Sequence, residues 1–166
     1  MGYTHYYTPK ESTSKKFEEF STRCKKLYEA LPEKSGTAGG YASDQKIEIR
    51  GGDGTGKPEF TKEKVWFNGN SKNGTDHETL GISSKDKNGW NFCKTQRKPY
   101  DLLVCAVLIA SHDLLGYEVT SDGDLDDWIP AMKFYLDTIY GNELSENEEI
   151  GRIMPKFLVE ELKVSR

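Results

Sequence analysis

Cationic side chains gather in one short segment, between an expected strand and an expected helix. Residues 94–98 read Lys-Thr-Gln-Arg-Lys and carry three cations in five positions. A helix N-terminus beside them would add unpaired N–H groups and the positive end of a helix dipole. The candidate ligands for a phosphate or another small anion are therefore Lys94, Thr95, Arg97 and Lys98. A solvated basic turn is the alternative interpretation, and the sequence leaves both open.

Aromatic side chains form the second group of candidates. They fall on expected strands and turns, and they are Tyr3, His5, Tyr7, Trp66, Trp90, Phe92 and Trp128. A nucleotide base gains about 1–3 kcal/mol by stacking on such a ring. Packing in a core or on a sheet surface is the alternative for each of them. A glycine-rich turn at 51–56 would also let the backbone approach a ligand closely, unless it is an ordinary surface loop.

The common catalytic signatures are missing from the sequence. There is no GxSxG, HExxH or CxxC, and Pro58 stands where a phosphate-binding loop needs a hydroxyl. Residues 122–127 (DGDLDD) have the aspartate spacing of a calcium loop, but Asp127 and Lys133 replace the glycine and glutamate that such a loop requires. We expect a helix-capping turn there, and no enzyme, metal or cofactor. A nucleotide-processing hydrolase that uses His5 or His77 as acid or base stays open as an alternative.

The charge of the chain is small in total and uneven along its length. The 166 residues have a net charge of −4 and a pI of about 5.5, whereas a protein that coats nucleic acid needs a basic field. Residues 1–112 hold 18 cationic and 14 anionic side chains, and residues 113–149 hold one cation and 11 anions. The acidic flank would repel a long polyanion. We therefore expect no DNA or RNA polymer as partner, while a small anion remains compatible.

The cysteines and the apolar segments indicate where in the cell the protein is expected. Cys24, Cys93 and Cys105 are odd in number and lack paired spacing, which indicates reduced structural thiols. The most apolar stretch, residues 102–110, is far shorter than the roughly 20 residues that span a bilayer. The N-terminus lacks the pattern of a signal peptide. We expect a cytoplasmic protein with no membrane partner.

Periodicity predicts the elements that must position these residues. Strands are expected at 2–7, 46–50, 65–68, 78–83, 90–95 and 117–120. In the first strand, Tyr3, His5 and Tyr7 would share one face, and the strands at 78–83 and 90–95 are expected to form a hairpin. Helices are expected from Thr8–Glu11 to Leu31, with Ser12 and Ser14 as rival caps, and at 100–115, 127–140 and 155–163. The second of these is apolar almost all round from 102 to 110, and Asp126 or Asp127 is expected to cap the third. Residues 33–44 are expected to form a loop. The first helix has one apolar stripe, formed by Phe17, Phe20, Cys24, Leu27 and Leu31.

This order of elements predicts the fold class and the domain organisation. Mixed strands and helices favour an α+β fold, a largely antiparallel sheet with about three helices packed mainly on one face. Residues 1–141 are expected to form one such domain. Residues 142–166 are expected to form an acidic, flexible linker and a short C-terminal helix.

Several short motifs, taken in order, resemble a known family. They are MGYTHY at the start, DGTGKP (53–58), WFNG (66–69), HET (77–79), FCKT (92–95), KPYD (98–101), SDGD (121–124) and DW (127–128). Over residues 1–141 the chain resembles a widespread family of small phage and bacterial proteins that open with this first motif. It is also similar to the phage anti-CBASS sponge proteins, which bind cyclic dinucleotide immune signals, sequester them without cleavage and assemble as homo-oligomers.

This resemblance implies a phage immune-evasion protein in the cytoplasm of the infected host, with a cyclic dinucleotide and further copies of itself as partners. The candidate site residues suit such a ligand. Tyr3, His5 and Tyr7 would stack with bases. Lys94, Thr95 and Lys98 would hold phosphate. Arg50, Asn68 or Asp122 would read a base edge. A phage protein that blocks a host protein through its acidic flank stays open as a further alternative.

Overall fold

The strand nearest the N-terminus is the centre of a three-stranded antiparallel sheet. The computed structural model describes residues 2–35, 45–87, 89–141 and 147–164. Strand β1 (Thr4–Thr8) pairs on one side with β5 (Asn91–Lys94) and on the other with β6 (Glu118–Ser121). Three segments that lie far apart in the sequence thus meet in one sheet, and the N-terminal motif lies between the other two.

A second antiparallel sheet contains β2 (Glu59–Phe60), β3 (Lys64–Phe67) and β4 (Leu80–Ser83), in that order. The expected hairpin between 78–83 and 90–95 is wrong, because β4 pairs with β3 while β5 pairs with β1. The register explains this partnership. It sets fully buried apolar residues on β3 opposite fully buried apolar residues on β4, and this match across strands outweighs the short loop between β4 and β5.

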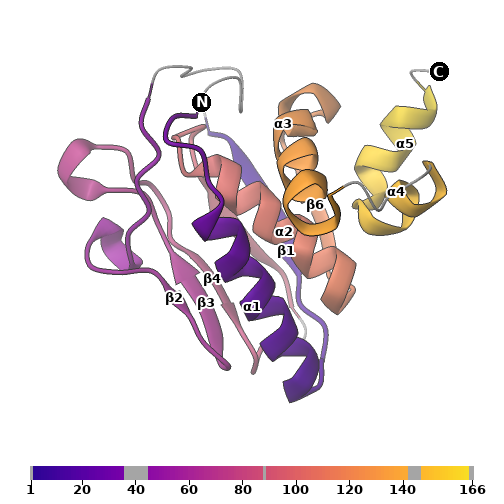
Figure 1. Cartoon of the computed structure of the whole chain (residues 1–166), viewed down its shortest axis with the longest axis horizontal. Helices are drawn as coiled ribbons and strands as arrows, with labels where there is room; N and C mark the ends of the chain where they lie inside the picture. Colours follow the sequence, from indigo (N-terminus) through magenta and orange to yellow (C-terminus); the bar gives the residue numbers. More distant parts are fainter. Residues whose placement is uncertain (1, 36–44, 88, 142–146, 165–166) are drawn as a thin grey trace.

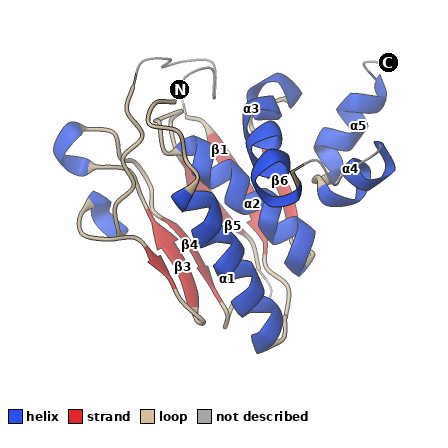
Figure 2. Ribbon diagram, in the orientation of Figure 1, coloured by secondary structure: helices blue, strands red, loops and turns tan. Residues whose placement is uncertain are grey.

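Three helices cover the same side of the two sheets. They are α1 (Ser14–Glu29), α2 (Asp101–Leu115) and α3 (Leu125–Tyr135), and Figure 1 shows α1 and α2 lying across the strands. Every residue of α2 from 101 to 111 is buried, so this helix forms the centre of the core. The α+β fold with helices on one side of antiparallel sheets is confirmed (Figure 2).

Helix α1 begins later than the sequence suggests. Its N-cap is Thr13, whose hydroxyl accepts a hydrogen bond from the Lys16 N–H. The expected start at Thr8–Glu11 is wrong because Thr8 still belongs to β1 and is paired with Glu118. The expected apolar stripe of this helix is confirmed. Its members within the helix, Phe17, Phe20, Cys24 and Leu27, are all buried.

The acidic turn before α3 caps that helix. Asp124 accepts a hydrogen bond from the Asp127 N–H, and the Asp127 carboxylate accepts one from the Asp124 N–H, which together form a capping box. The expected cap at Asp126 or Asp127 is therefore displaced to Asp124. The prediction that residues 122–127 form a helix-capping turn is confirmed. A π-helical turn, Leu136–Tyr140, continues the helix.

The remaining differences lie in loops and at the C-terminus. The expected strand at 46–50 is reduced to isolated bridges at Lys46 and Arg50. Residues 36–44 and 142–146 lie outside the described residues, so the predicted loop at 33–44 and the acidic linker are described only in part. Helix α4 (Asn147–Ile153) begins within the segment expected to be flexible, and α5 (Lys156–Val164) forms near the expected 155–163.

The C-terminal helix packs against the rest of the fold. The ring of Phe157 on α5 makes an edge contact with Trp128 of α3, with 5.4 Å between ring centroids, and Leu158 is fully buried. Within the described part of the chain, no helix has the length and apolar character required to cross a membrane.

The capping box gives a direct test of the start of α3. We expect Asp124→Ala to lower the free energy of unfolding by about 1 kcal/mol, since the Asp127 N–H loses its acceptor. Asp124→Asn is the matched control, because asparagine caps nearly as well as aspartate. Urea unfolding followed by circular dichroism measures both. Equal losses in the two variants would contradict the capping role.

Candidate functional site

Strand β1 presents two different surfaces. His5 and Tyr7 point into the core and are almost completely buried, and Tyr3, just before the strand, is buried beside His5. Tyr6 lies on the opposite face, as strand geometry requires. The predicted grouping of Tyr3, His5 and Tyr7 on one face is thus confirmed. That face is covered by helices, so these three rings are not available on the surface for a base to stack on.

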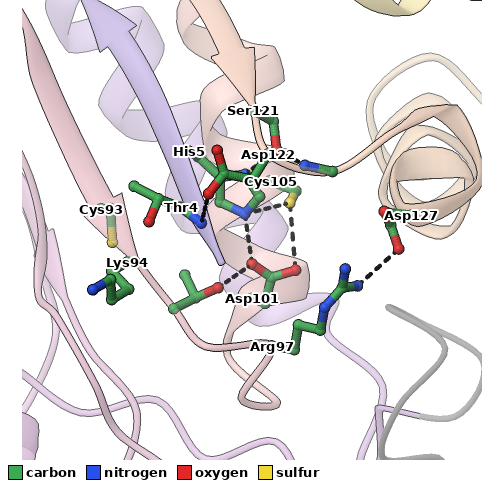
Figure 3. Close-up of polar contacts among 12 residues, drawn as sticks. Thr4, His5, Cys93, Lys94, Arg97, Asp101, Cys105, Ser121, Asp122 and Asp127 are labelled. Atoms are coloured by element: carbon green, nitrogen blue, oxygen red, sulfur yellow. Dashed lines mark hydrogen bonds and ion pairs between the residues drawn. The ribbon is translucent and has the colours of Figure 1, made fainter. Parts of the chain in front are cut away.

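The centre of the core contains a hydrogen-bonded cluster around His5 (Figure 3). His5 Nε2 lies 2.7 Å from Asp101 Oδ1 on α2, and His5 Nδ1 lies 2.7 Å from Ser121 Oγ on β6. The Thr95 hydroxyl donates to the same Asp101 oxygen at 2.6 Å. The Cys105 thiol lies 3.6 Å from Asp101 Oδ2 and 3.4 Å from His5 Nε2. We call His5, Asp101 and Cys105 the buried cluster.

This arrangement satisfies polar groups that would otherwise be costly to bury. A buried carboxylate without partners is strongly destabilising, whereas Asp101 interacts with His5, Thr95 and Cys105. Burial, followed by the charge of Asp101, raises the pKa of the Cys105 thiol well above its usual range. Cys105 is therefore a protonated thiol here, and it lacks the thiolate character of a nucleophile.

An arginine from the predicted basic segment stacks on Tyr3, the ring that lies beside His5. The Arg97 guanidinium stacks over the Tyr3 ring, 3.9 Å from its centroid, and Arg97 Nη1 lies 2.8 Å from Asp127 Oδ1. Partial burial raises the pKa of Asp127, but the hydrogen bonds and charge of Arg97 together with the capping contacts to Asp124 outweigh it and lower that pKa overall. Arg97 and its neighbour Gln96 both adopt positive φ, which is unusual for side-chain-bearing residues.

The other residues of the basic segment are divided between the core and the surface. Thr95 is fully buried on Asp101, so it serves the buried cluster. Lys98 Nζ donates to the carbonyl of Gly74 at 3.0 Å. Lys94 is partly exposed at the end of β5, and its side chain passes so close to Gly2 that a Cβ there would lie 2.8 Å from Lys94 Cε. Of the three cations in this segment, Lys94 is therefore the one that lies on a strand of the first sheet.

Asn68 and Arg50 lie together in another part of the molecule. Their backbones form an isolated antiparallel bridge. The Asn68 side chain is buried, donates to His77 O and Thr79 Oγ1, and accepts from two backbone N–H groups. The Arg50 guanidinium donates to Glu48 Oε2 and to the Ile49 carbonyl. All the hydrogen-bonding atoms of the Asn68 amide are engaged in holding loops, so the predicted base-reading role for these two residues gains no support from their contacts.

The uncovered side of the first sheet carries a row of rings, two of them exposed and the third, Tyr6, partly buried. Trp90 is 62% exposed and Phe92 is 49% exposed. The Tyr6 and Trp90 rings stack with 5.4 Å between centroids and 19° between planes, and Trp90 lies 5.4 Å from Phe92. Phe92 is paired with Tyr6 across β5 and β1. We call Tyr6, Trp90 and Phe92 the aromatic face.

A cation and a carboxylate border the aromatic face. Lys94 follows Phe92 by two residues on β5, and the alternation of a strand puts both side chains on the same side. On the β6 side, Asp122 accepts hydrogen bonds from the Thr4 N–H and the Tyr6 hydroxyl, each at 3.1 Å. Two residues predicted from the sequence, Lys94 and Asp122, are therefore brought together with exposed rings.

Sequence reasoning missed part of this site. It placed Trp90 and Phe92 among the possible stacking rings, but it assigned the stacking role on β1 to Tyr3, His5 and Tyr7 instead of Tyr6. The alternation in residues 91–94, where Phe92 must face away from the buried Cys93, was the available signal. No comparable signal identified Asp101 or Ser121, since their roles depend on contacts between distant segments.

Comparisons with known proteins give no relative from which a role could be transferred. No family model matches the chain, and no curated protein or solved structure matches it significantly.

The buried cluster predicts a strong dependence of stability on Asp101. We expect Asp101→Asn to destabilise the fold by roughly 1–3 kcal/mol, because an amide cannot accept from all the donors around it and brings an N–H₂ group of its own. Asp53→Asn makes the same chemical change at an exposed position whose positive φ asparagine tolerates. Urea unfolding should show a loss only for Asp101→Asn. A loss no larger than that of Asp53→Asn would refute the structural role.

Proposed function

We propose that this protein binds a cyclic dinucleotide at the aromatic face and sequesters it without cleavage. The exposure of Trp90 and Phe92 on an uncovered sheet is the observation that carries the proposal. Neighbouring large rings that are exposed together commonly mark a surface that a ligand or partner covers. Sheet surfaces with exposed aromatic side chains are a recurrent way of stacking nucleotide bases in proteins.

The polar groups beside the rings fit the rest of such a ligand. A cyclic dinucleotide has two bases and two phosphodiester anions in one small ring. The aromatic face supplies surfaces for the bases, and Lys94 supplies a cation for a phosphate. Asp122 has lone pairs beyond those used by Thr4 and Tyr6, and these can accept from the N–H groups of a base such as guanine.

Binding without turnover is supported by the position of the residues that hydrolysis would need. His5, one proposed acid or base of the hydrolase alternative, is fully buried on the other side of β1 from Tyr6. Both of its ring nitrogens are engaged, one by Asp101 and one by Ser121. A ligand on the aromatic face therefore meets rings, Lys94 and Asp122, and does not meet this histidine.

The biological role and the assembly extend this proposal. The resemblance to the sponge proteins supports phage immune evasion, in which the host's signal is removed from its receptor. A cyclic dinucleotide is nearly two-fold symmetric, and two copies of this chain related by a two-fold axis would present two identical aromatic faces to it. We propose a homo-oligomer whose subunits enclose the ligand between these faces.

A nucleotide panel tests the proposal. The protein is incubated with cyclic dinucleotides of different bases, and native mass spectrometry reports the subunit number and the bound mass together. We expect one of these nucleotides to bind, to raise the melting temperature, and to be recovered chemically intact after denaturation. Failure of the whole panel to bind would refute the proposal. Recovery of a cleaved nucleotide would support the hydrolase alternative, and a stoichiometric host protein captured from lysate in place of nucleotide would support the host-blocking alternative.

Substitutions then locate the ligand on the protein. We expect Trp90→Ala and Phe92→Ala each to weaken binding about 5- to 150-fold, which corresponds to the roughly 1–3 kcal/mol of one base stack. Trp66→Phe is the matched control. Trp66 is also exposed, but it lies on β3 of the second sheet, where its ring packs against Gly52 and Gly81. Isothermal titration calorimetry measures the three variants, and unchanged binding in Trp90→Ala would place the ligand elsewhere.

The salt dependence of ligand binding tests the role of Lys94 separately. Lys94→Gln removes one cation from the edge of the aromatic face without shortening the side chain much. We expect weaker binding at low salt and a smaller loss of affinity as salt is raised, because added ions screen one fewer charge interaction. Lys98→Gln is the control, since Lys98 is directed to the Gly74 carbonyl. An identical salt dependence in wild type and Lys94→Gln would contradict a phosphate contact.

A further inference from the structure

We propose that the buried cluster of His5, Asp101 and Cys105 is a binding site for one transition-metal ion, with Zn²⁺ as the best fit. All three residues are buried, and their ligand atoms lie within 4.8 Å of one another. Imidazole nitrogen, carboxylate oxygen and thiolate sulfur are the ligand types that zinc takes in proteins. This site does not depend on the proposed function, because it lies on the opposite side of β1 from Tyr6 and the aromatic face.

The spacing of the ligand atoms suits tetrahedral coordination. Zinc–ligand bonds of about 2.0–2.3 Å place neighbouring ligand atoms roughly 3.3–3.7 Å apart. Cys105 Sγ lies 3.4 Å from His5 Nε2 and 3.6 Å from Asp101 Oδ2, within that range. The 2.7 Å between His5 Nε2 and Asp101 Oδ1 is a hydrogen-bond distance. The carboxylate would therefore coordinate through Oδ2, the oxygen that already lies beside Cys105. On metal binding the His5 Nε2–Asp101 Oδ1 hydrogen bond breaks, and bonds from both residues to the ion take its place in linking β1 to α2.

Neighbouring hydroxyl groups orient two of the three ligands. Ser121 Oγ lies 2.7 Å from His5 Nδ1, the ring nitrogen that a metal on Nε2 leaves free. The Thr95 hydroxyl donates to Asp101 Oδ1, the oxygen that coordination through Oδ2 leaves free. Metal ligands in proteins commonly have outer partners of this kind, which fix their orientation and their protonation state.

The charges and protons of the site balance on binding. A divalent ion with one carboxylate and one thiolate forms a neutral unit, which can be buried at a lower cost than a charged one. Binding displaces the proton of the Cys105 thiol to solvent and forms the metal–sulfur bond. A neutral His5 keeps its single ring proton, which then lies on Nδ1 and is donated to Ser121 Oγ.

The buried indole N–H of Trp128, next to the cluster, has no hydrogen-bond partner among the described residues. The ring makes an edge contact with His5 at 5.1 Å between centroids. Three protein ligands leave the fourth tetrahedral position to a water molecule or a hydroxide. Such an oxygen ligand beside His5 would supply an acceptor for the Trp128 indole where the described residues supply none. Hydrogen bonds also hold the cluster together without a metal. The experiment must therefore distinguish the metal-bound cluster from the metal-free one.

The test uses the full chain expressed in medium supplemented with Zn²⁺ or with Co²⁺, which serves as a spectroscopic substitute. After dialysis, elemental analysis should give one metal ion per chain, and the cobalt form should show a thiolate-to-cobalt charge-transfer band and tetrahedral visible absorption. Wild-type protein that folds but retains no metal would overturn the proposal, and this result needs no variant.

Two cysteine variants assign the site. Cys105→Ala should lose the charge-transfer band and at least tenfold in metal affinity. Cys24→Ala removes another fully buried thiol, on α1, and should retain both. Circular dichroism confirms that each variant is folded. A band that persists in Cys105→Ala, or that disappears in Cys24→Ala, would overturn the assignment to the buried cluster. Addition of a strong chelator to wild type should lower its melting temperature, and an unchanged melting temperature would contradict a metal held in the core.

Discussion

The contact between His5 and Asp101 in the centre of the core constrains the rest of the structure. It joins the middle strand of one sheet to the first turn of the most buried helix, and both side chains are almost without solvent contact. Burial of a carboxylate is favourable only when its hydrogen bonds are satisfied. Ser121 and Thr95 complete the arrangement, so that β6 and the loop before α2 must lie where they do. These hydrogen bonds fix how β1, β6 and α2 are placed against one another, which hydrophobic burial alone would define less precisely.

The aromatic face follows from the same constraint. Because side chains alternate along a strand, commitment of His5 and Tyr7 to the core directs Tyr6 outward. The pairing with β5 then sets Phe92 opposite Tyr6, and Trp90 stacks on the diagonal. The helices lie on the other side, so nothing in the described fold covers these rings. A rigid, hydrogen-bonded strand beneath them provides the preorganisation that a stacking surface needs.

Local patterns in the sequence predicted the fold class, but contacts between distant segments decided the site. The buried stripe of α1, the all-round apolar α2 and the α+β class follow from periodicity and were confirmed. The hairpin at 78–83 and 90–95 was wrong, since the choice of strand partner depends on buried residues of β3 and β1 that a local pattern does not contain. Lys94 and Asp122 were found by their chemistry. Asn68, by contrast, has its side chain taken up by loop contacts that only the folded chain reveals.

We propose that a cyclic dinucleotide stacks on Trp90 and Phe92 while the core beneath stays closed. The three tryptophans report on three different places, since Trp66 lies on the second sheet, Trp90 on the aromatic face and Trp128 against His5. Nuclear magnetic resonance of the three indole N–H groups during titration with the bound nucleotide separates these places directly. Stacking on the aromatic face should give a large, saturable shift for Trp90 and little change for Trp66 and Trp128. A saturable shift confined to Trp128 or to Trp66, with Trp90 unmoved, would contradict it.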